Sequence, residues 1–285
     1  MIPNKLKRLW AEGKPTLNGW CSIGNAFTAE IMAAQGYDSI TIDVQHGALD
    51  YSHLLPMLQA TRASGVVPMA RVPWLEPGII MKTLDAGAYG IICPMVNDAR
   101  QAAEFVSYLR YPPLGQRSFG PTRVSFAAGA DYGAHANDEM LALAMIETAE
   151  GMANLTSIAA TPGLDGIYVG PADLTLGLAQ GRLAPGFDRE EPEMIAALKE
   201  IVAACKANGI RAALREIVAA CEANGIRAAL HCGTPEYAAR AIEWGFDMTT
   251  VSGDSRLLAS AAGASVAKFR QLVGQIGAKA EKGAY

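Results

Sequence analysis

Several features typical of nucleic-acid-binding, membrane or secreted proteins are missing from this sequence. Lysine and arginine total 24 against 28 aspartates and glutamates, a formal net charge of −4, without the basic excess that binding to a phosphate backbone requires. No run of about 18 apolar residues is present, and the opening MIPNKLK lacks the apolar core of a secretory signal. We therefore expect a cytoplasmic protein that binds neither nucleic acid nor a membrane.

Cysteine pairs and a dinucleotide-binding fingerprint are missing too. The five cysteines contain no C-x-x-C pair, so neither a zinc ribbon nor a disulfide framework is indicated, and we expect buried free thiols. No G-x-G-x-x-G follows the first predicted strand, which argues against dinucleotide binding. Apolar residues, by contrast, make up 51% of the 285 residues, and the mean hydropathy is +0.14, as expected for a globular chain with a sizeable core.

Short β-rich runs alternate along the chain with segments of helical spacing. Eight strands are predicted, at residues 17–23, 39–43, 67–72, 89–93, 143–147, 166–170, 226–232 and 247–252. Eight such units are typical of a (β/α)8 barrel, whereas an open doubly wound sheet more often has about five or six strands. We predict an α/β protein, a single (β/α)8 TIM barrel domain over residues 1–285.

Two further segments are predicted around this barrel. The connection between the fourth and fifth strands holds a helix at about residues 99–109 and an extended loop at 111–121, and such loops usually lie over the active face of a barrel. Residues 255–285 form a C-terminal helical extension with an apolar face. That face either docks on another subunit or packs against its own barrel.

Residues 199–214 and 215–230 form a tandem duplication, KEIVAACKANGIRAAL followed by REIVAACEANGIRAAL, with two differences. A solenoid needs at least three units, so a recent or engineered copy is indicated. Because a barrel has no place for an additional strand, we predict that residues 210–214 join a helix, as their Ala-Ala-Leu favours. The second copy then supplies the seventh strand, and the insert adds a protruding helix or a longer one broken at Asn208-Gly209.

Two acidic residues follow predicted strands. Glu147 comes directly after the apolar run 143–146, and Asp173 follows the run 166–169 after Gly-Pro-Ala. Because the carboxyl ends of parallel strands open on one face, the two side chains can converge. Two convergent carboxylates suit Mg²⁺ or Mn²⁺; alternatively, each is a helix N-cap.

The second and third strands also end in polar residues. Asp43 and His46 stand three positions apart, so Asp43 could fix the tautomer of His46 and raise its basicity, as a general base requires. Alternatively, His46 caps a helix or contacts a backbone carbonyl. Arg71 offers a planar fork to a substrate carboxylate, or it pairs with a neighbouring strand-end acid.

Two other candidates are less central. His231 ends the seventh predicted strand and could line the pocket. Asp85 lies ahead of the fourth strand, near the end of the preceding helix, and is less naturally part of its own subunit's catalytic face. Together, the cation, the arginine and the histidine base suit proton abstraction next to a carbonyl, with the metal stabilising an enolate.

Six segments of the chain carry a resemblance to a known family: IDVQHG, ARVPW, LDAGAYGIICPMV, YPPLGQRSFGP, AMIETAEGMANL and LDGIYVGPADL. In this order and spacing they resemble the HpcH/HpaI family of divalent-metal-dependent (class II) pyruvate aldolases. The resemblance runs over residues 17–254, interrupted only by the duplication.

This resemblance implies roles for five residues at the barrel mouth. Glu147 and Asp173 would hold Mg²⁺, Mn²⁺ or Co²⁺, and pyruvate would chelate that metal through its carboxylate and keto oxygens. Arg71 would contact the keto acid, and His46, oriented by Asp43, would be the acid/base.

The resemblance also implies further contacts and an assembly. Gly170, Pro171 and Ala172 would bind substrate, and Asp85 would reach a neighbouring subunit's site. A homohexamer of dimers that exchange C-terminal helices would fit the extra helix of this chain.

The reaction implied is reversible cleavage of a 4-hydroxy-2-oxo acid into an aldehyde and pyruvate, or a related 2-oxo acid such as hydroxypyruvate, through a metal-stabilised enolate. Alternatives are citryl- or malyl-CoA-lyase chemistry, for which no basic cluster for the CoA phosphates is evident, and oxaloacetate decarboxylation on the same metal site. A non-catalytic barrel, disabled by the duplication, is the alternative outside enzymes.

The chain departs from the family pattern at several positions. Val44 and Gln45 replace a Gly-Glu found in many members, Met145 replaces a glutamine, and Ser118 replaces a glycine that often follows the loop arginine. Loss of the glutamate at position 45 and of the glutamine at position 145 changes the surroundings of the metal and of the aldehyde acceptor.

Overall fold

Eight parallel strands close into a barrel in this computed structural model, which describes residues 1–213 and 226–282. Each strand pairs with the next, and the eighth pairs with the first. The strands are β1 (Thr16–Cys21), β2 (Ser39–Asp43), β3 (Val67–Arg71), β4 (Gly90–Cys93), β5 (Leu141–Ile146), β6 (Gly166–Val169), β7 (Arg227–Cys232) and β8 (Met248–Val251). The predicted (β/α)8 barrel is confirmed.

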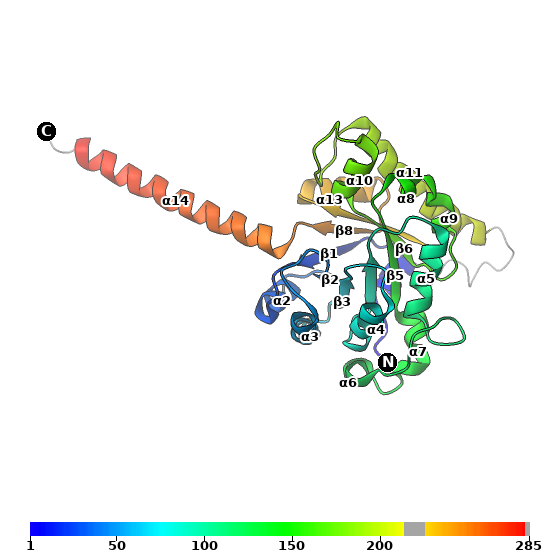
Figure 1. The fold of residues 1–285 in the computed structure, drawn as a ribbon. Coiled ribbons are helices and arrows are strands. Elements are labelled where there is room, and N and C mark those ends of the chain that lie inside the picture. Colours follow the sequence, from blue (N-terminus) through cyan, green and yellow to red (C-terminus); the bar gives the residue numbers. More distant parts are fainter. Residues whose placement is uncertain (214–225, 283–285) are drawn as a thin grey trace.

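Helices connect the strands and surround the barrel (Figure 1). They are α1 (Lys5–Ala11), α2 (Ala26–Ala33), α3 (Tyr51–Ala60), the 3-10 turn η1 (Thr61–Ser64), α4 (Pro77–Asp85), α5 (Ala99–Leu109), α6 (Thr122–Ala128), α7 (Tyr132–Glu139), α8 (Ala149–Ala153), α9 (Leu155–Ala159), α10 (Pro171–Ala179), α11 (Pro192–Ala213), α13 (Pro235–Glu243) and α14 (Asp254–Lys282).

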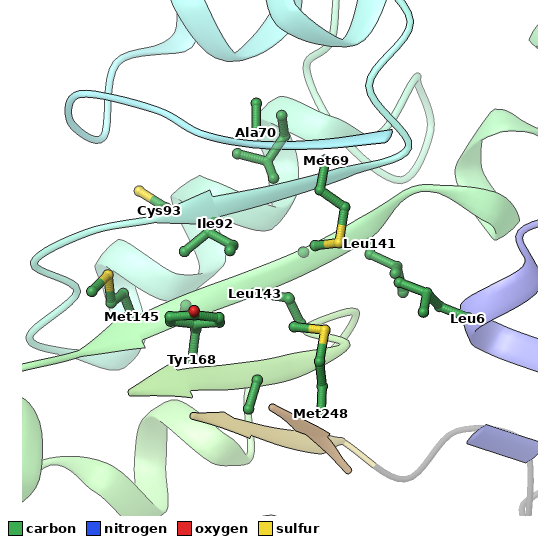
Figure 2. Close-up of a cluster of buried hydrophobic side chains, with 14 of the residues drawn as sticks. Leu6, Met69, Ala70, Ile92, Cys93, Leu141, Leu143, Met145, Tyr168 and Met248 are labelled. Carbon is green, nitrogen blue, oxygen red and sulfur yellow. The ribbon is translucent and has the colours of Figure 1, made fainter. Parts of the chain in front are cut away.

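Alternate residues of each strand fill the inside of the barrel. Figure 2 shows Leu6 of α1 beside Leu141 at one end of this interior, and Met145 beside Tyr168 at the other. Met145 and Tyr168 are register partners on β5 and β6, and all four side chains are buried. Side chains just beyond the carboxyl ends of the strands therefore surround a mouth above a packed core.

The first copy of the duplication is helical in the structure. Helix α11 ends at Ala213, so it includes residues 210–213 and runs through Asn208 and Gly209 without a break. Strand β7, Arg227–Cys232, comes from the second copy and leads into His231. The helical prediction is confirmed for residues 210–213, while Leu214 lies outside the described residues.

The connection between β4 and β5 differs from the prediction. Helix α5 has the predicted bounds, but the loop after it lies near the amino terminus, beside α6 and α7 (Figure 1). The backbone N–H of Ile2 donates to the carbonyl of Ala128 there, and the Asn4 side chain donates to the carbonyl of Glu139 at 2.9 Å. The expectation that residues 111–121 cover the active face is wrong, because α5 first returns the chain to the opposite end of the barrel.

Helix α14 leaves the barrel and points away from it (Figure 1). It exposes apolar side chains along its described length, namely Leu257, Leu258, Val266, Phe269 and Leu272. The alternative that this helix packs against its own barrel is wrong. Among the described residues, no helix is long and apolar enough to cross a membrane, and the four described cysteines are buried free thiols, as expected, with Cys221 outside those residues.

Candidate active site

A cavity of about 420 Å³ opens at the carboxyl ends of the strands. It is lined by predicted residues from β2, β3 and the segment after β6, namely Asp43, His46, Arg71, Gly170, Pro171, Ala172 and Asp173. The fold brings these residues together because all parallel strands of the barrel end on the same face.

Asp43 binds Arg71 and, in the part of the chain that the structure describes, makes no hydrogen bond with the imidazole of His46. The Asp43 carboxylate accepts hydrogen bonds from Arg71 Nε at 2.9 Å and Nη2 at 2.6 Å, and from the Trp20 indole at 3.2 Å. From His46 it accepts only the backbone N–H, at 3.2 Å. The prediction that Asp43 orients the His46 ring is wrong, because the guanidinium makes a two-pronged contact that occupies both carboxylate oxygens.

The electrostatics of Asp43 follow from this pairing. Burial raises the pKa of Asp43, but the hydrogen bonds and positive charge of Arg71 outweigh it and hold the pKa below its usual value. The alternative reading of Arg71, an ion pair with a strand-end acid, is confirmed. The pair fixes Arg71 at the mouth of the barrel.

His46 and Arg71 each keep a group free toward the cavity. The His46 side chain is exposed and makes no hydrogen bond with any residue that the structure describes. Among the described residues, Arg71 Nη1 donates a hydrogen bond only to the Met145 sulfur, at 4.0 Å. A base and a cationic donor are therefore both open to a bound molecule.

Glu147 and Asp173 place two negative charges next to each other. Glu147 Oε1 accepts the backbone N–H of Met95 at 2.9 Å. Burial raises the pKa of Glu147 to about 7; the Met95 amide opposes this rise and the charge of Asp173 adds to it. Within residues 1–213 and 226–282, nothing donates a hydrogen bond to Glu147 Oε2 or to the Asp173 carboxylate.

The donor set fits a hard divalent cation. Two carboxylates with unpaired oxygens suit Mg²⁺ or Mn²⁺. In the described part of the chain, no group of three or more His, Cys, Asp or Glu side chains could hold a metal ion. A cation here would take its remaining ligands from water or substrate, as Mg²⁺ commonly does.

Local backbone features keep Glu147 in place. A Cβ atom at position 170 would lie 2.4 Å from Glu147 Oε2 and 2.5 Å from Met145 Cε, so Gly170 lets β6 end against this carboxylate. Met95 has a φ of 57°, a left-handed conformation that is uncommon outside glycine and turns its N–H toward Glu147. Sequence reasoning missed Met95, because the motif carries no sign of this conformation.

Helix α10 begins at the cavity wall. Gly170 is its N-cap and Pro171 its first residue, and the cavity is lined by Ala172 and Asp173 of the first turn. The first N–H groups of a helix have no partner within it and carry partial positive charge. This turn can therefore receive a carboxylate.

Asp85 lies outside the cavity. It is the last residue of α4, which places it toward the amino-terminal end of the barrel, and it accepts a hydrogen bond from Arg117 Nη2 at 2.7 Å. Burial raises the pKa of Asp85, although Arg117 acts to lower it. Its predicted contribution to a neighbouring subunit's site stays a prediction.

Three aromatic residues at the cavity were missed from the sequence: Trp20, Tyr168 and Phe187. Strand alternation could have found Tyr168, since it lies two residues before Gly170 and so on the same face. Phe187 lies between α10 and α11 and carries no such signal. His231 does line the cavity.

Comparisons with known proteins agree with this geometry. The family model described as HpcH/HpaI aldolase/citrate lyase matches residues 19–261. A hydroxypyruvate/pyruvate aldolase from Rhizorhabdus wittichii is 39% identical over 269 residues, covering 94% of this chain and 100% of the relative. A 5-keto-4-deoxy-D-glucarate aldolase from Klebsiella pneumoniae is 36% identical over 211 residues, 73% of this chain and 80% of the relative.

A solved structure agrees as well. The crystal structure of an HpcH/HpaI aldolase/citrate lyase family protein from Burkholderia cenocepacia has a TM-score of 0.81 and 30% identity, covering 94% of this chain and 99% of the other. The family model spans residues 19–261, and the R. wittichii relative and this solved structure each cover 94% of the chain. It belongs to the HpcH/HpaI aldolase/citrate lyase family and is a carbon–carbon lyase.

Proposed function

We propose that this chain reversibly cleaves 4-hydroxy-2-oxo acids into an aldehyde and pyruvate or hydroxypyruvate, with a divalent cation such as Mg²⁺, Mn²⁺ or Co²⁺. The observation that carries the proposal is that His46, Arg71 and Asp173 line one cavity. Among the described residues, the His46 ring and the Asp173 carboxylate have no hydrogen-bond partner, and Arg71 Nη1 has only the weak acceptor Met145 Sδ. The relative from R. wittichii, named a hydroxypyruvate/pyruvate aldolase, supports the choice of 2-oxo acid.

The carboxylate of the 2-oxo acid would be bound by positive groups of this chain. In the described residues Arg71 Nη1 donates only to the Met145 sulfur, a weak acceptor, while Asp43 holds the other guanidinium nitrogens. The first turn of α10, with Ala172 and Asp173 at the wall, adds backbone N–H groups without helical partners. A planar carboxylate between these groups would be held in one orientation.

Glu147 and Asp173 would hold the cation through their unpaired oxygens. When bound, a divalent cation supplies positive charge that polarises the keto group and stabilises the enolate, an effect of several kcal/mol. Gly170 and Met95 keep the Glu147 carboxylate in place for this role.

His46 would move the proton. In the cleavage direction its imidazole takes the proton of the 4-hydroxyl group, the C3–C4 bond breaks, and the electron pair stays with the 2-oxo acid fragment as the aldehyde leaves. The protonated His46 then returns the proton to C3. Condensation follows the same steps in reverse.

Pyruvate release from a 4-hydroxy-2-oxo acid, measured with and without EDTA, tests the reaction. We expect chelation to abolish activity and added Mg²⁺ or Mn²⁺ to restore it. His46→Ala should lower kcat by about 10² to 10⁴, the usual contribution of a positioned base, without loss of cation binding.

His135→Ala is the matched control, since His135 is exposed on α7 outside the cavity and should leave kcat unchanged. Activity that persists in EDTA would refute the metal role. Unchanged turnover of His46→Ala would remove His46 from the mechanism.

We also propose that the chain forms a homo-oligomer, a hexamer built from dimers that exchange α14. The exposed apolar face of α14, which its own barrel leaves uncovered, supports this assembly. Cytoplasmic localisation and the expected lack of nucleic-acid and membrane partners stay predictions.

A further inference from the structure

A chain of hydrogen-bonded side chains crosses the barrel below the cavity and ends at His231. Asn18 Nδ2 donates to Thr250 Oγ1 at 3.0 Å. The hydroxyl oxygens of Thr250 and Tyr168 are 2.8 Å apart, and Tyr168 Oη lies 3.2 Å from His231 Nδ1. Asn18, Thr250 and Tyr168 are fully buried, so this chain connects the inside of the barrel to the cavity wall.

Two neighbouring hydroxyl groups fix the orientation of the Asn18 side-chain amide, the first group in this series of hydrogen bonds. Asn18 Oδ1 accepts from Ser39 Oγ at 2.8 Å and from Thr41 Oγ1 at 3.0 Å. The reversed amide would leave the buried Thr41 hydroxyl hydrogen without an acceptor among the residues described, which is unfavourable. The Asn18 NH2 group therefore faces Thr250.

The orientation of the Asn18 amide fixes which atom donates in each later hydrogen bond, up to His231. Thr250 accepts from Asn18, so its own hydrogen goes to Tyr168 Oη, and Tyr168 donates to His231 Nδ1. Burial raises the pKa of Tyr168, so it keeps its hydrogen at neutral pH. Burial, with the charge of Arg71, lowers the pKa of His231 to about 3, so its ring is neutral. A neutral ring that accepts at Nδ1 carries its proton on Nε2.

The Nε2–H group of His231 has no partner in the described part of the chain. The ring is only partly buried and lines the cavity between Trp20 and Phe187, with ring centroids 4.9 Å from each. The Trp20 N–H is already bound to Asp43. On this aromatic wall, His231 offers a hydrogen-bond donor to a molecule in the cavity.

This wall faces the part of the cavity that the 2-oxo acid leaves open. Arg71 comes from β3, Glu147 follows β5, and Asp173 follows β6. His231 comes from β7 and Trp20 from β1. Arg71 Cζ lies 4.9 Å from the centroid of the Trp20 ring, so the aromatic wall begins beside this arginine and continues to His231. With the 2-oxo acid on Arg71 and the two carboxylates, we place the aldehyde along this wall, beside His231.

We propose that His231 determines acceptor specificity by donating a hydrogen bond from Nε2–H to a hydroxyl group next to the aldehyde carbon. The preferred acceptors are thus 2-hydroxyaldehydes, and Tyr168 is a positioning residue that holds the donor tautomer. This inference rests on the proposed function and names the second substrate class of the same site.

Glycolaldehyde and propionaldehyde test this, since they have the same number of non-hydrogen atoms and differ by a hydroxyl in place of a methyl group. Each is condensed with pyruvate, and the ratio of the two kcat/KM values is measured. We expect His231→Leu to lower the glycolaldehyde-to-propionaldehyde ratio about 3- to 10-fold, the effect of one neutral hydrogen bond. His231→Gln, which keeps an N–H donor, should retain part of the preference.

Two controls distinguish an effect on aldehyde binding from a general loss of activity. His135→Leu makes the same substitution at an exposed histidine outside the cavity and should leave the ratio unchanged. Enzyme-catalysed exchange of the pyruvate methyl protons needs no aldehyde, so it should persist in His231→Leu.

Tyr168→Phe gives a second test that leaves His231 in place. It removes the hydroxyl group that donates to His231 Nδ1, so the donor tautomer of His231 is no longer held. The glycolaldehyde-to-propionaldehyde ratio should therefore fall, while the phenylalanine ring still fills the core. Nitrogen-15 NMR of the imidazole rings gives a readout apart from activity, because the chain has four histidines. We expect the His231 proton on Nε2 in the native protein and a mixture of tautomers in Tyr168→Phe.

The outcomes distinguish this inference from the proposed function. A native protein that condenses pyruvate with neither aldehyde contradicts the proposed function, and this inference with it. A native protein active on both, with a ratio that His231→Leu leaves unchanged, overturns the inference alone. A proton found on Nδ1 of His231 also overturns it.

Discussion

At the residue scale, one carboxylate organises the 2-oxo acid side of the cavity. Asp43 holds two nitrogens of Arg71, and the third donates only to the Met145 sulfur among the described residues. The Trp20 indole donates to the same carboxylate. A positioned guanidinium loses little conformational freedom when it binds an anion. Asp43 thus contributes to binding through Arg71, and from His46 it accepts only the backbone N–H among the hydrogen bonds that the structure describes.

Replacing Asp43 with asparagine should lower stability by about 3–5 kcal/mol near pH 7, because it leaves the buried Arg71 charge without its partner. The pKa of Asp43 is depressed in the folded state, so the unfolded state binds the proton more readily. The stabilising contribution is therefore present above the usual aspartate pKa of about 4 and is lost as pH falls through the folded-state value.

Urea unfolding of the native protein and Asp43→Asn over a pH series would measure this. The difference in unfolding free energy should stay constant from neutral pH down to mildly acidic pH and shrink below it. Asp138→Asn, at an exposed position, is the control and should change stability by less than about 0.5 kcal/mol. A difference that grows on acidification would contradict the assigned role of the pair.

At the element scale, the duplication is accommodated in a helix. Ile201, Val202 and Cys205 of the first copy are buried against the barrel. The second copy repeats the same residue types at the equivalent positions and supplies β7. Either copy alone therefore holds the whole helix-to-strand sequence.

Deleting residues 199–214 should consequently give a shorter α11 with the same buried face and an unchanged β7. We expect the melting temperature to stay the same or rise, because less chain is ordered for the same buried core, and kcat to be retained. Thermal unfolding and pyruvate release measure both. A deletion variant that fails to fold would show that the inserted residues are needed for the barrel.

At the scale of the whole molecule, α14 extends beyond the barrel with its apolar side chains exposed (Figure 1). Asp254, at its start, accepts hydrogen bonds from the backbone N–H groups of Ser22 and Ile23, so the helix is tied to the end of β1. Such a face is covered efficiently only by another copy of the chain or another apolar surface.

A chain ending at Arg256 keeps these bonds and removes the exposed apolar face. We expect the full chain to form an oligomer and the truncated chain to have a lower assembly mass in size-exclusion chromatography with light scattering. Lys268→Ala, on the same helix, is the control for the assembly. Equal masses for the full and truncated chains would exclude α14 from the interface.

The sequence by itself determined the eight strands, the helix before β7 and the acids after β5 and β6. Period-two and helical patterns are local properties, and parallel strands of a barrel must end on one face. The sequence also placed His46 and Arg71 at that face, because both stand at strand ends.

Only the tertiary structure decided which groups meet across that face. Asp43 is closer in sequence to His46, yet it binds Arg71 on the neighbouring strand, because strand pairing places position 43 opposite position 71. The proton on His231 Nε2 likewise depends on Asn18, more than two hundred residues away, through contacts across the barrel. Such partners follow from strand register and packing, which no local pattern in the sequence encodes.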